Sequence, residues 1–116
     1  MAIQTVGEKN SLATKYGTDA TYAALYTTAP GATAGTEVTG GSPAYARKAL
    51  TWGAPSNGVI TATATFDVPA GATIAGAGLH SAVTAGTYLD GQSVTSQAFA
   101  SQGVYTITFT YTQSRG

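Results

Sequence analysis

Two segments with strict alternation of apolar and polar residues constrain the fold most. In the first, residues 59–68, the apolar positions are Ile60, Ala62, Ala64, Phe66 and Val68, and threonines or an aspartate stand between them. The second, residues 104–112, alternates Tyr, Ile, Phe and Tyr with four threonines. Successive side chains of a β-strand point to opposite faces of its sheet. The period of two therefore predicts two strands, each with one buried face and one exposed threonine face, and we expect the second to have an antiparallel neighbour.

The remaining chain is divided by Gly and Pro turns into further short segments of β character. Four of them read as strands: residues 20–28, 44–52, 73–83 and 87–90. Asn57-Gly58 is typical of a two-residue hairpin turn. Gly76 and Gly78 indicate a bulge or the close approach of another backbone. About six strands at this spacing predict an all-β fold, a compact antiparallel β-sandwich or Greek-key barrel, and we favour the Greek-key sandwich.

Two segments near the amino terminus differ from this pattern. Residues 6–17 are compatible with a short helix ended by Gly17, within an amino-terminal arm at residues 1–19. Residues 29–43 have no apolar periodicity and predict a long loop, which in a compact domain is usually either functional or flexible. We take this loop as the first candidate for a partner contact, with a mobile loop of no specific role as the alternative. Residues 1–116 are expected to form a single β domain.

The charge content argues against several classes of partner. Charged residues make up 9% of the chain, against about 25% in an average domain. Five basic residues balance five acidic ones and form no basic stripe, so we expect no nucleic-acid partner. The amino terminus lacks the basic start and apolar run of a signal peptide, and no segment is long enough to span a membrane. We therefore expect cytoplasmic synthesis without secretion, and a weakly charged surface that suits a protein held between neighbours.

The residues that usually carry chemistry are nearly absent. His80 is the one histidine, and the adjacent Ser81 would point to the opposite face of a strand, which disfavours a catalytic pair. Without cysteine, and with five acids that lack ligand spacing, the chain offers no metal site. We expect no catalytic residue, no metal and no cofactor, and hence no enzyme. A cleft in which His80 faced Asp67 or Asp90 would argue otherwise.

One group of residues is a candidate partner interface. It consists of Glu37, Tyr45, Arg47 and Trp52. Arg, Tyr and Trp are the residue types that dominate interface hot spots. The alternative is that Tyr45 and Trp52 belong to the core of the domain itself. Threonine is a favourable residue on exposed strand faces, which explains these positions better than ice or sugar binding. Low-charge threonine faces would also associate at a sheet edge unless they were covered, which again points to a partner.

Several segments resemble one family. The most specific is Glu37-Val-Thr-Gly-Gly-Ser-Pro-Ala-Tyr-Ala-Arg47, and Leu25-Tyr-Thr-Thr-Ala-Pro-Gly31 and Phe66-Asp-Val-Pro-Ala-Gly71 continue the likeness. From residue 20 onward the chain is similar to small virion proteins encoded by tailed bacteriophages. It departs from the Leu-His-Thr-Ala-Asp-Pro of such relatives at Tyr26 and Ala29, which weakens a metal-binding role for that motif.

The resemblance implies a structural component of the virion. We favour a capsid decoration, or cement, protein that binds the outside of the head and stabilises it, because a neutral domain without a fibrous repeat can bridge capsid subunits. Its partner would be the major capsid protein, and the symmetry of such lattices is compatible with a homo-oligomer such as a trimer. A minor tail or tail-fibre-associated protein that binds tail proteins is the alternative. A carbohydrate-binding β module is the second alternative.

Overall fold

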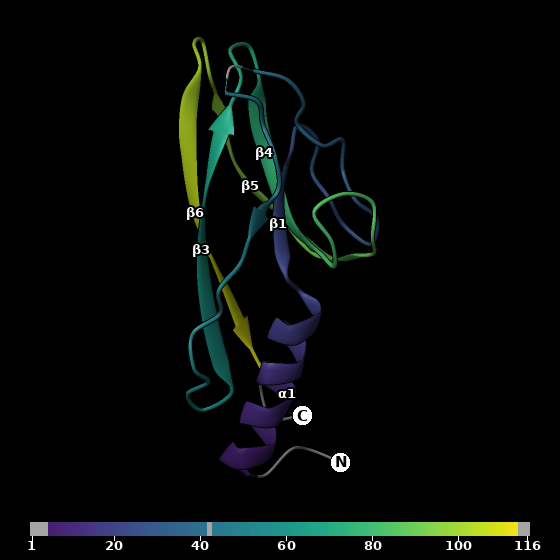
Figure 1. The fold of residues 1–116 in the computed structure, drawn as a ribbon, viewed down its shortest axis with the longest axis vertical. Coiled ribbons are helices and arrows are strands. Elements are labelled where there is room, and N and C mark those ends of the chain that lie inside the picture. The colour runs from purple at the N-terminus through teal and green to yellow at the C-terminus, as the bar shows by residue number, and fades with distance from the viewer. Residues whose placement is uncertain (1–4, 42, 114–116) are drawn as a thin grey trace.

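The computed structural model describes residues 5–41 and 43–113 and consists mostly of β-strands (Figure 1). Its elements are α1 (Val6–Asp19), β1 (Tyr22–Tyr26), β2 (Lys48–Ala49), β3 (Val59–Val68), β4 (Thr73–His80), β5 (Tyr88–Ala98) and β6 (Gly103–Thr112). The predicted six-stranded all-β fold with a short amino-terminal helix is therefore confirmed.

The strands form two antiparallel sheets that face each other. The larger sheet has the order β2-β1-β4-β5, and the smaller consists of β3 and β6. The chain extends over 48 × 23 × 23 Å, with α1 at one end of the long axis and the β3–β4 and β5–β6 connections at the other (Figure 1). The predicted sandwich is thus confirmed, with two strands in one layer and four in the other.

The smaller sheet follows directly from the alternating pattern. β3 and β6 pair without interruption from Val59↔Thr112 to Val68↔Gly103. The apolar positions of β3 are buried and its threonines are exposed. Two pairs of threonine hydroxyls, on Thr63 with Thr108 and on Thr65 with Thr106, are 3.0 Å apart across the outer face. This face is therefore a regular array of threonines that ends in one charged residue on β3, Asp67.

The core lies between the two sheets. Phe66 on β3 is fully buried and stacks on Tyr45, with ring centroids 6.0 Å apart. The larger sheet contributes Leu25 from β1 and Ile74 from β4, both fully buried. Because many of the other core positions are alanines, these few bulky side chains supply most of the apolar area that folding removes from water.

The predicted end of the helix at Gly17 is wrong. The helix α1 continues to Asp19, and the N–H of Ala20 bonds to the carbonyl oxygen of Tyr16. Gly17 lies in a closely packed contact instead, because a β-carbon there would lie 3.1 Å from the ring of Trp52 and 3.2 Å from Ile60. A glycine that allows close helix packing has the same local sequence signature as one that caps a helix.

Four predicted strands have different bounds in the structure. The strand expected at 20–28 is limited to β1, and the one expected at 73–83 ends with β4 at His80. The strand expected at residues 44–52 is reduced to β2, because Tyr45 and Arg47 turn toward Glu37 and form hydrogen bonds there. The strand expected at 87–90 extends to Ala98 as β5. Most residues of β5 are exposed, so its sequence lacks the alternation that burial of one face would impose.

The bulge predicted in the glycine-rich strand is confirmed, whereas the closest approach at its glycines is made by side chains and not by another backbone. The pairing of β4 with β5 shifts register between Ile74 and Gly76, and again between Leu79 and His80. At Gly76 a β-carbon would come within 2.2 Å of Pro30, and at Gly78 within 2.6 Å of the ring of Tyr26. These glycines leave room on the sheet for the Tyr26 side chain of β1 and for Pro30 after β1. None of the helices described here combines the length and apolar character needed to cross a membrane.

Candidate functional site

Residues 36–38 of the predicted long loop pair with β1 at the edge of the larger sheet, and Pro30 lies close to Gly76 and Gly91 of that sheet. Within the loop Val38 is buried, and its N–H donates to the carbonyl oxygen of Leu25 on β1 at 3.1 Å. Glu37 forms an isolated bridge with Tyr26. Residues 31–34 at the tip are exposed. The loop thus has a segment that pairs with β1 and a tip that is exposed.

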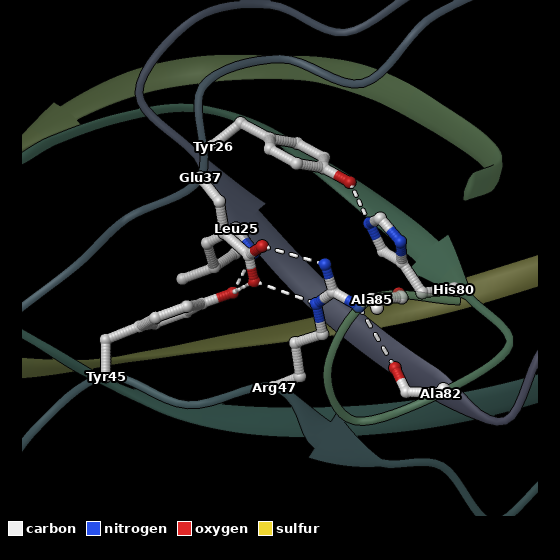
Figure 2. A network of polar contacts seen from close by, with 8 residues as sticks. All are labelled: Leu25, Tyr26, Glu37, Tyr45, Arg47, His80, Ala82 and Ala85. Carbon is white, nitrogen blue, oxygen red and sulfur yellow. Dashed lines mark hydrogen bonds and ion pairs between the residues drawn. The ribbon is translucent and has the colours of Figure 1, made fainter. Parts of the chain in front are cut away.

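A cluster of polar side chains ties this loop to the body of the domain (Figure 2). The guanidinium of Arg47 binds Glu37 through two hydrogen bonds, Nε to Oε2 at 3.0 Å and Nη2 to Oε1 at 2.9 Å. The hydroxyl of Tyr45 donates to Oε2 of Glu37 at 2.8 Å and accepts from the N–H of Leu25 at 2.9 Å. The cluster therefore joins residue 37, residues 45 and 47, and β1.

Arg47 also holds a second loop. Its Nη1 donates to the carbonyl oxygens of Ala82 and Ala85, at 3.1 and 2.9 Å, in the turn between β4 and β5. In that turn Ala85 has a positive φ of 53°, as has Gly86 at 72°. One guanidinium therefore fixes two loops at once, through a fork geometry that lysine could not reproduce.

The electrostatics of the cluster fit a structural ion pair. The side chains of Arg47 and Glu37 are 11% and 27% exposed. Burial alone would raise the pKa of Glu37, but hydrogen bonds from Arg47 and Tyr45 outweigh it, so that this pKa lies below its ordinary value. The hydrogen bond to Glu37 likewise raises the pKa of Arg47. Both groups stay charged at neutral pH and attract each other.

A buried pair, Tyr26 and His80, lies beside this cluster (Figure 2). The hydroxyl of Tyr26 and Nε2 of His80 form a hydrogen bond. Nδ1 of His80 is buried, and no partner for it occurs in residues 5–41 and 43–113. Burial lowers the pKa of His80, and the nearby positive charge of Arg47 lowers it further. The imidazole is therefore neutral in the folded protein at neutral pH.

We expect the protein to lose stability on mild acidification because of His80. A histidine whose folded-state pKa lies below its unfolded value takes up its proton more readily when unfolded. The contribution of neutral His80 to the free energy of unfolding is then fully present above pH 6.5, the ordinary pKa of histidine, and decreases as the pH drops below it. Urea unfolding at pH 7.5 and pH 5.5 measures this effect, and a His80→Gln variant should lose less stability between the two. An equal loss in both proteins would assign the effect to other groups.

Trp52 lies apart from the other predicted interface residues. Its indole Nε1 donates to the carbonyl oxygen of Ala20 at 2.8 Å, and its ring meets that of Tyr16 edge-on. Both Trp52 and Tyr45 are partly buried and pack against the core, as the alternative in the sequence analysis expected. The structure thus brings Glu37, Tyr45 and Arg47 together and places Trp52 under α1. Their part in a partner interface stays a prediction.

Sequence reasoning missed a cavity between the free sides of β5 and β6. It has a volume of about 230 Å³ and is lined by both apolar and polar groups, among them Val94, Ile107, Phe109 and Asp90. The hydroxyl of Tyr16 donates to Asp90 at 2.9 Å, and Tyr16 stacks on Tyr111 with ring centroids 3.9 Å apart. Only the arrangement of the two sheets creates this cavity, so no local pattern could have revealed it.

The carboxylates that would have suggested catalysis are engaged elsewhere. Asp90 binds Tyr16, and Asp67 lies 4.0 Å from Nζ of Lys48. Ser81 accepts a hydrogen bond from the N–H of Thr87. In the part of the chain that the structure describes, no group of three or more His, Cys, Asp or Glu residues could hold a metal. His80 is thus paired with a tyrosine and contributes to packing.

The fold is an antiparallel β-sandwich in which the Arg47–Glu37 ion pair ties two loops to the larger sheet. The family described as "Podophage GP4 fiber I protein gp80" has a model that matches residues 11–113, and the chain belongs to this family. The resemblance to small virion proteins of tailed phages is therefore confirmed, and the chain is a structural protein of the virion. The family's description fits the tail-fibre alternative better than capsid decoration. No curated protein and no solved structure shows significant similarity to the chain.

Proposed function

We propose that this chain is a non-enzymatic protein of the tail-fibre apparatus that binds other tail proteins as a single β domain. The observation that carries this proposal is membership, over residues 11–113, in a family described as a phage fibre protein. The contribution is mechanical: each copy covers area on its neighbours, and many modest contacts add up along the assembly. The sparse charge of the chain supports such a role, since charged residues are depleted at the cores of protein interfaces.

The proposed contact is the tip of the long loop, residues 31–34. Glu37, Tyr45 and Arg47 hold the segment that follows it on the sheet, and Pro30 just before it packs against Gly76. A loop that is already ordered loses less conformational freedom when it binds, which favours affinity. On this view the three predicted residues act in the interface by positioning the tip.

Capsid decoration, which the sequence analysis favoured, is the competing location. The sandwich and its loops would suit a capsid surface as well as a tail surface, so fold alone does not separate the two. The family description supports the tail, and no feature of the loop favours a capsid partner. The major capsid protein therefore serves as the comparison in the experiment.

The proposal predicts binding to tails and not to heads. Purified protein is sedimented with isolated tails and, separately, with emptied heads of the phage that encodes it, both prepared from particles lacking this protein. We expect co-sedimentation with tails alone, and Ala32→Arg at the exposed tip should weaken it by about tenfold, equivalent to ~1.4 kcal/mol. Ala70→Arg, at an exposed turn elsewhere, is the matched control and should bind normally.

Two results would count against the proposal. Binding to heads but not to tails would replace the tail location by capsid decoration. Equal binding of the Ala32→Arg and Ala70→Arg variants would remove the loop tip from the interface while leaving the location intact. Point substitution is preferable to deletion of the loop, because deletion would also remove the buried Val38 and the ion pair of Glu37.

A further inference from the structure

The β6 strand has a free edge whose backbone groups can be assigned. The N–H of Gln113 donates to the carbonyl oxygen of Gly58 at 2.8 Å, and the β3–β6 register then continues without a shift. Residues of an antiparallel strand bond alternately to one side and to the other. Val104 and the even-numbered threonines of β6 therefore direct their N–H and C=O groups away from β3. Across residues 5–41 and 43–113, no main-chain hydrogen bond reaches these groups.

This edge lacks the devices that usually protect an edge strand. Native proteins blunt such edges with charged residues, prolines or bulges. Residues 103–112 contain no charged residue and no proline, and their pairing with β3 has no bulge. In Figure 1 the upper half of β6 forms the border of the molecule. A ten-residue, uncharged and regular edge of this kind is a site for pairing with another strand.

The sequence of the strand indicates which strand it pairs with. Read outward from Thr108, it is nearly the same in both directions: Val104-Tyr-Thr-Ile-Thr-Phe-Thr-Tyr-Thr112. Antiparallel pairing of two copies about Thr108 would place Tyr105 opposite Tyr111 and Ile107 opposite Phe109. A two-fold contact requires one surface to complement itself, and a strand of this symmetry meets that requirement. Since β6 carries no charge, no like charges would face each other.

We propose that a second copy of this chain pairs along β6, antiparallel and centred on Thr108, so that two small sheets join as one four-stranded sheet. The threonine faces would continue across the join on the outside. On the inside, Ile107 and Phe109, which are only partly buried in one copy and line the cavity beside β5, would gain apolar neighbours. Cross-strand pairs of aromatic and β-branched residues stabilise such a sheet.

This inference goes beyond the proposed function, because it concerns a different surface and holds for a tail or a head location. Pairing of one edge joins two copies, whereas the trimer considered in the sequence analysis would need another contact. A strand from a different virion protein is the competing occupant of the same edge. The near-symmetry of the β6 sequence favours the second copy, because pairing with a strand of a different protein would not require β6 to read nearly the same in both directions.

A single cysteine tests the pairing directly. The sequence has no cysteine, so an introduced one can form a disulfide only with another copy. In the proposed register residue 108 lies opposite itself, at a Cα separation of ~5.5 Å, which a disulfide can span. We expect Thr108→Cys to form disulfide-linked dimers under mild oxidation at least ten times faster than Thr63→Cys. Thr63 is the matched control, because it faces Thr108 on the same exposed surface but lies on β3, at the opposite edge of the two-stranded sheet, where the proposed pairing brings no second copy.

Sedimentation equilibrium of proteins without cysteine gives the second measurement. The unmodified chain should be dimeric at high concentration, Thr108→Lys should shift it to monomer by placing two charges opposite each other, and Thr63→Lys should not. Thermal unfolding establishes that every variant is folded. Equal cross-linking at positions 63 and 108, or a monomer at all concentrations, would overturn the proposal. Cross-linking of Cys introduced at 108 to another virion protein alone would overturn the choice of occupant.

Discussion

Replacing Phe66 with alanine is expected to lower the free energy of unfolding by about 3 to 5 kcal/mol. The Phe66 side chain is fully buried between the two sheets, where it stacks on Tyr45. Its removal loses the transfer free energy of the ring and leaves a cavity. The surrounding alanines cannot fill that space, because they have no side-chain freedom. Since small domains have total stabilities of about 5 to 15 kcal/mol, the variant should be close to unfolding at physiological temperature.

Urea denaturation followed by tryptophan fluorescence measures this loss, with Trp52 as the single reporter. The control is Thr65→Ala, on the same strand but on its exposed face. It removes one threonine–threonine hydrogen bond to Thr106 and should cost less than about 1 kcal/mol. Similar losses of unfolding free energy in the two variants would mean that burial of the apolar face of β3 is not what stabilises the sandwich.

The second large effect is expected for Arg47→Met, which should lower the free energy of unfolding by about 2 to 3 kcal/mol. Breaking a buried ion pair by removing one partner costs about 3 to 5 kcal/mol, and the partial exposure of Glu37 reduces that figure. The variant leaves Glu37 without its main partner and frees the carbonyl oxygens of Ala82 and Ala85. Methionine retains an unbranched apolar stem, so lost packing contributes little.

The matched control for Arg47→Met is Lys48→Met, at the next position. The Nζ atom of Lys48 lies 4.0 Å from Asp67, and its side chain is 39% exposed. An exposed pair of this kind contributes about 0 to 1 kcal/mol. Susceptibility of residues 29–43 to limited proteolysis should rise in Arg47→Met and stay unchanged in Lys48→Met. Unchanged proteolysis in both variants would contradict the role of the ion pair in holding the loop.

The strands β3 and β6 could be predicted from sequence because burial of one face of a strand produces a strict alternation of apolar and polar residues. Ile60 to Val68 alternate with exposed residues, and the same period continues in β6. The Gly76 and Gly78 positions were also predictable, since only a bulge or a close contact explains glycine inside a strand. These features depend on neighbours within a few residues, so local sequence is sufficient to identify them.

The remaining features depend on contacts between distant segments. The pairing of Glu37 with Arg47 requires the loop to fold back on β1. The course of the loop leaves no periodic pattern in the sequence from which it could be predicted. Gly17 was misjudged because its neighbour, Trp52, is far away in sequence. Most of β5 escaped prediction because few of its residues are buried. Of the four candidate interface residues, three bind one another and Trp52 packs elsewhere, and their contact with a partner stays a prediction.

The location of the chain in the virion is the central claim and can be measured by electron cryomicroscopy of the phage. The account predicts density matching the sandwich, with α1 at one end, on the tail-fibre apparatus, and no such density on the outer surface of the head. Comparison with particles that lack the protein would assign the density to this chain. Density that matches the sandwich on the head lattice, with none on the tail, would contradict the account.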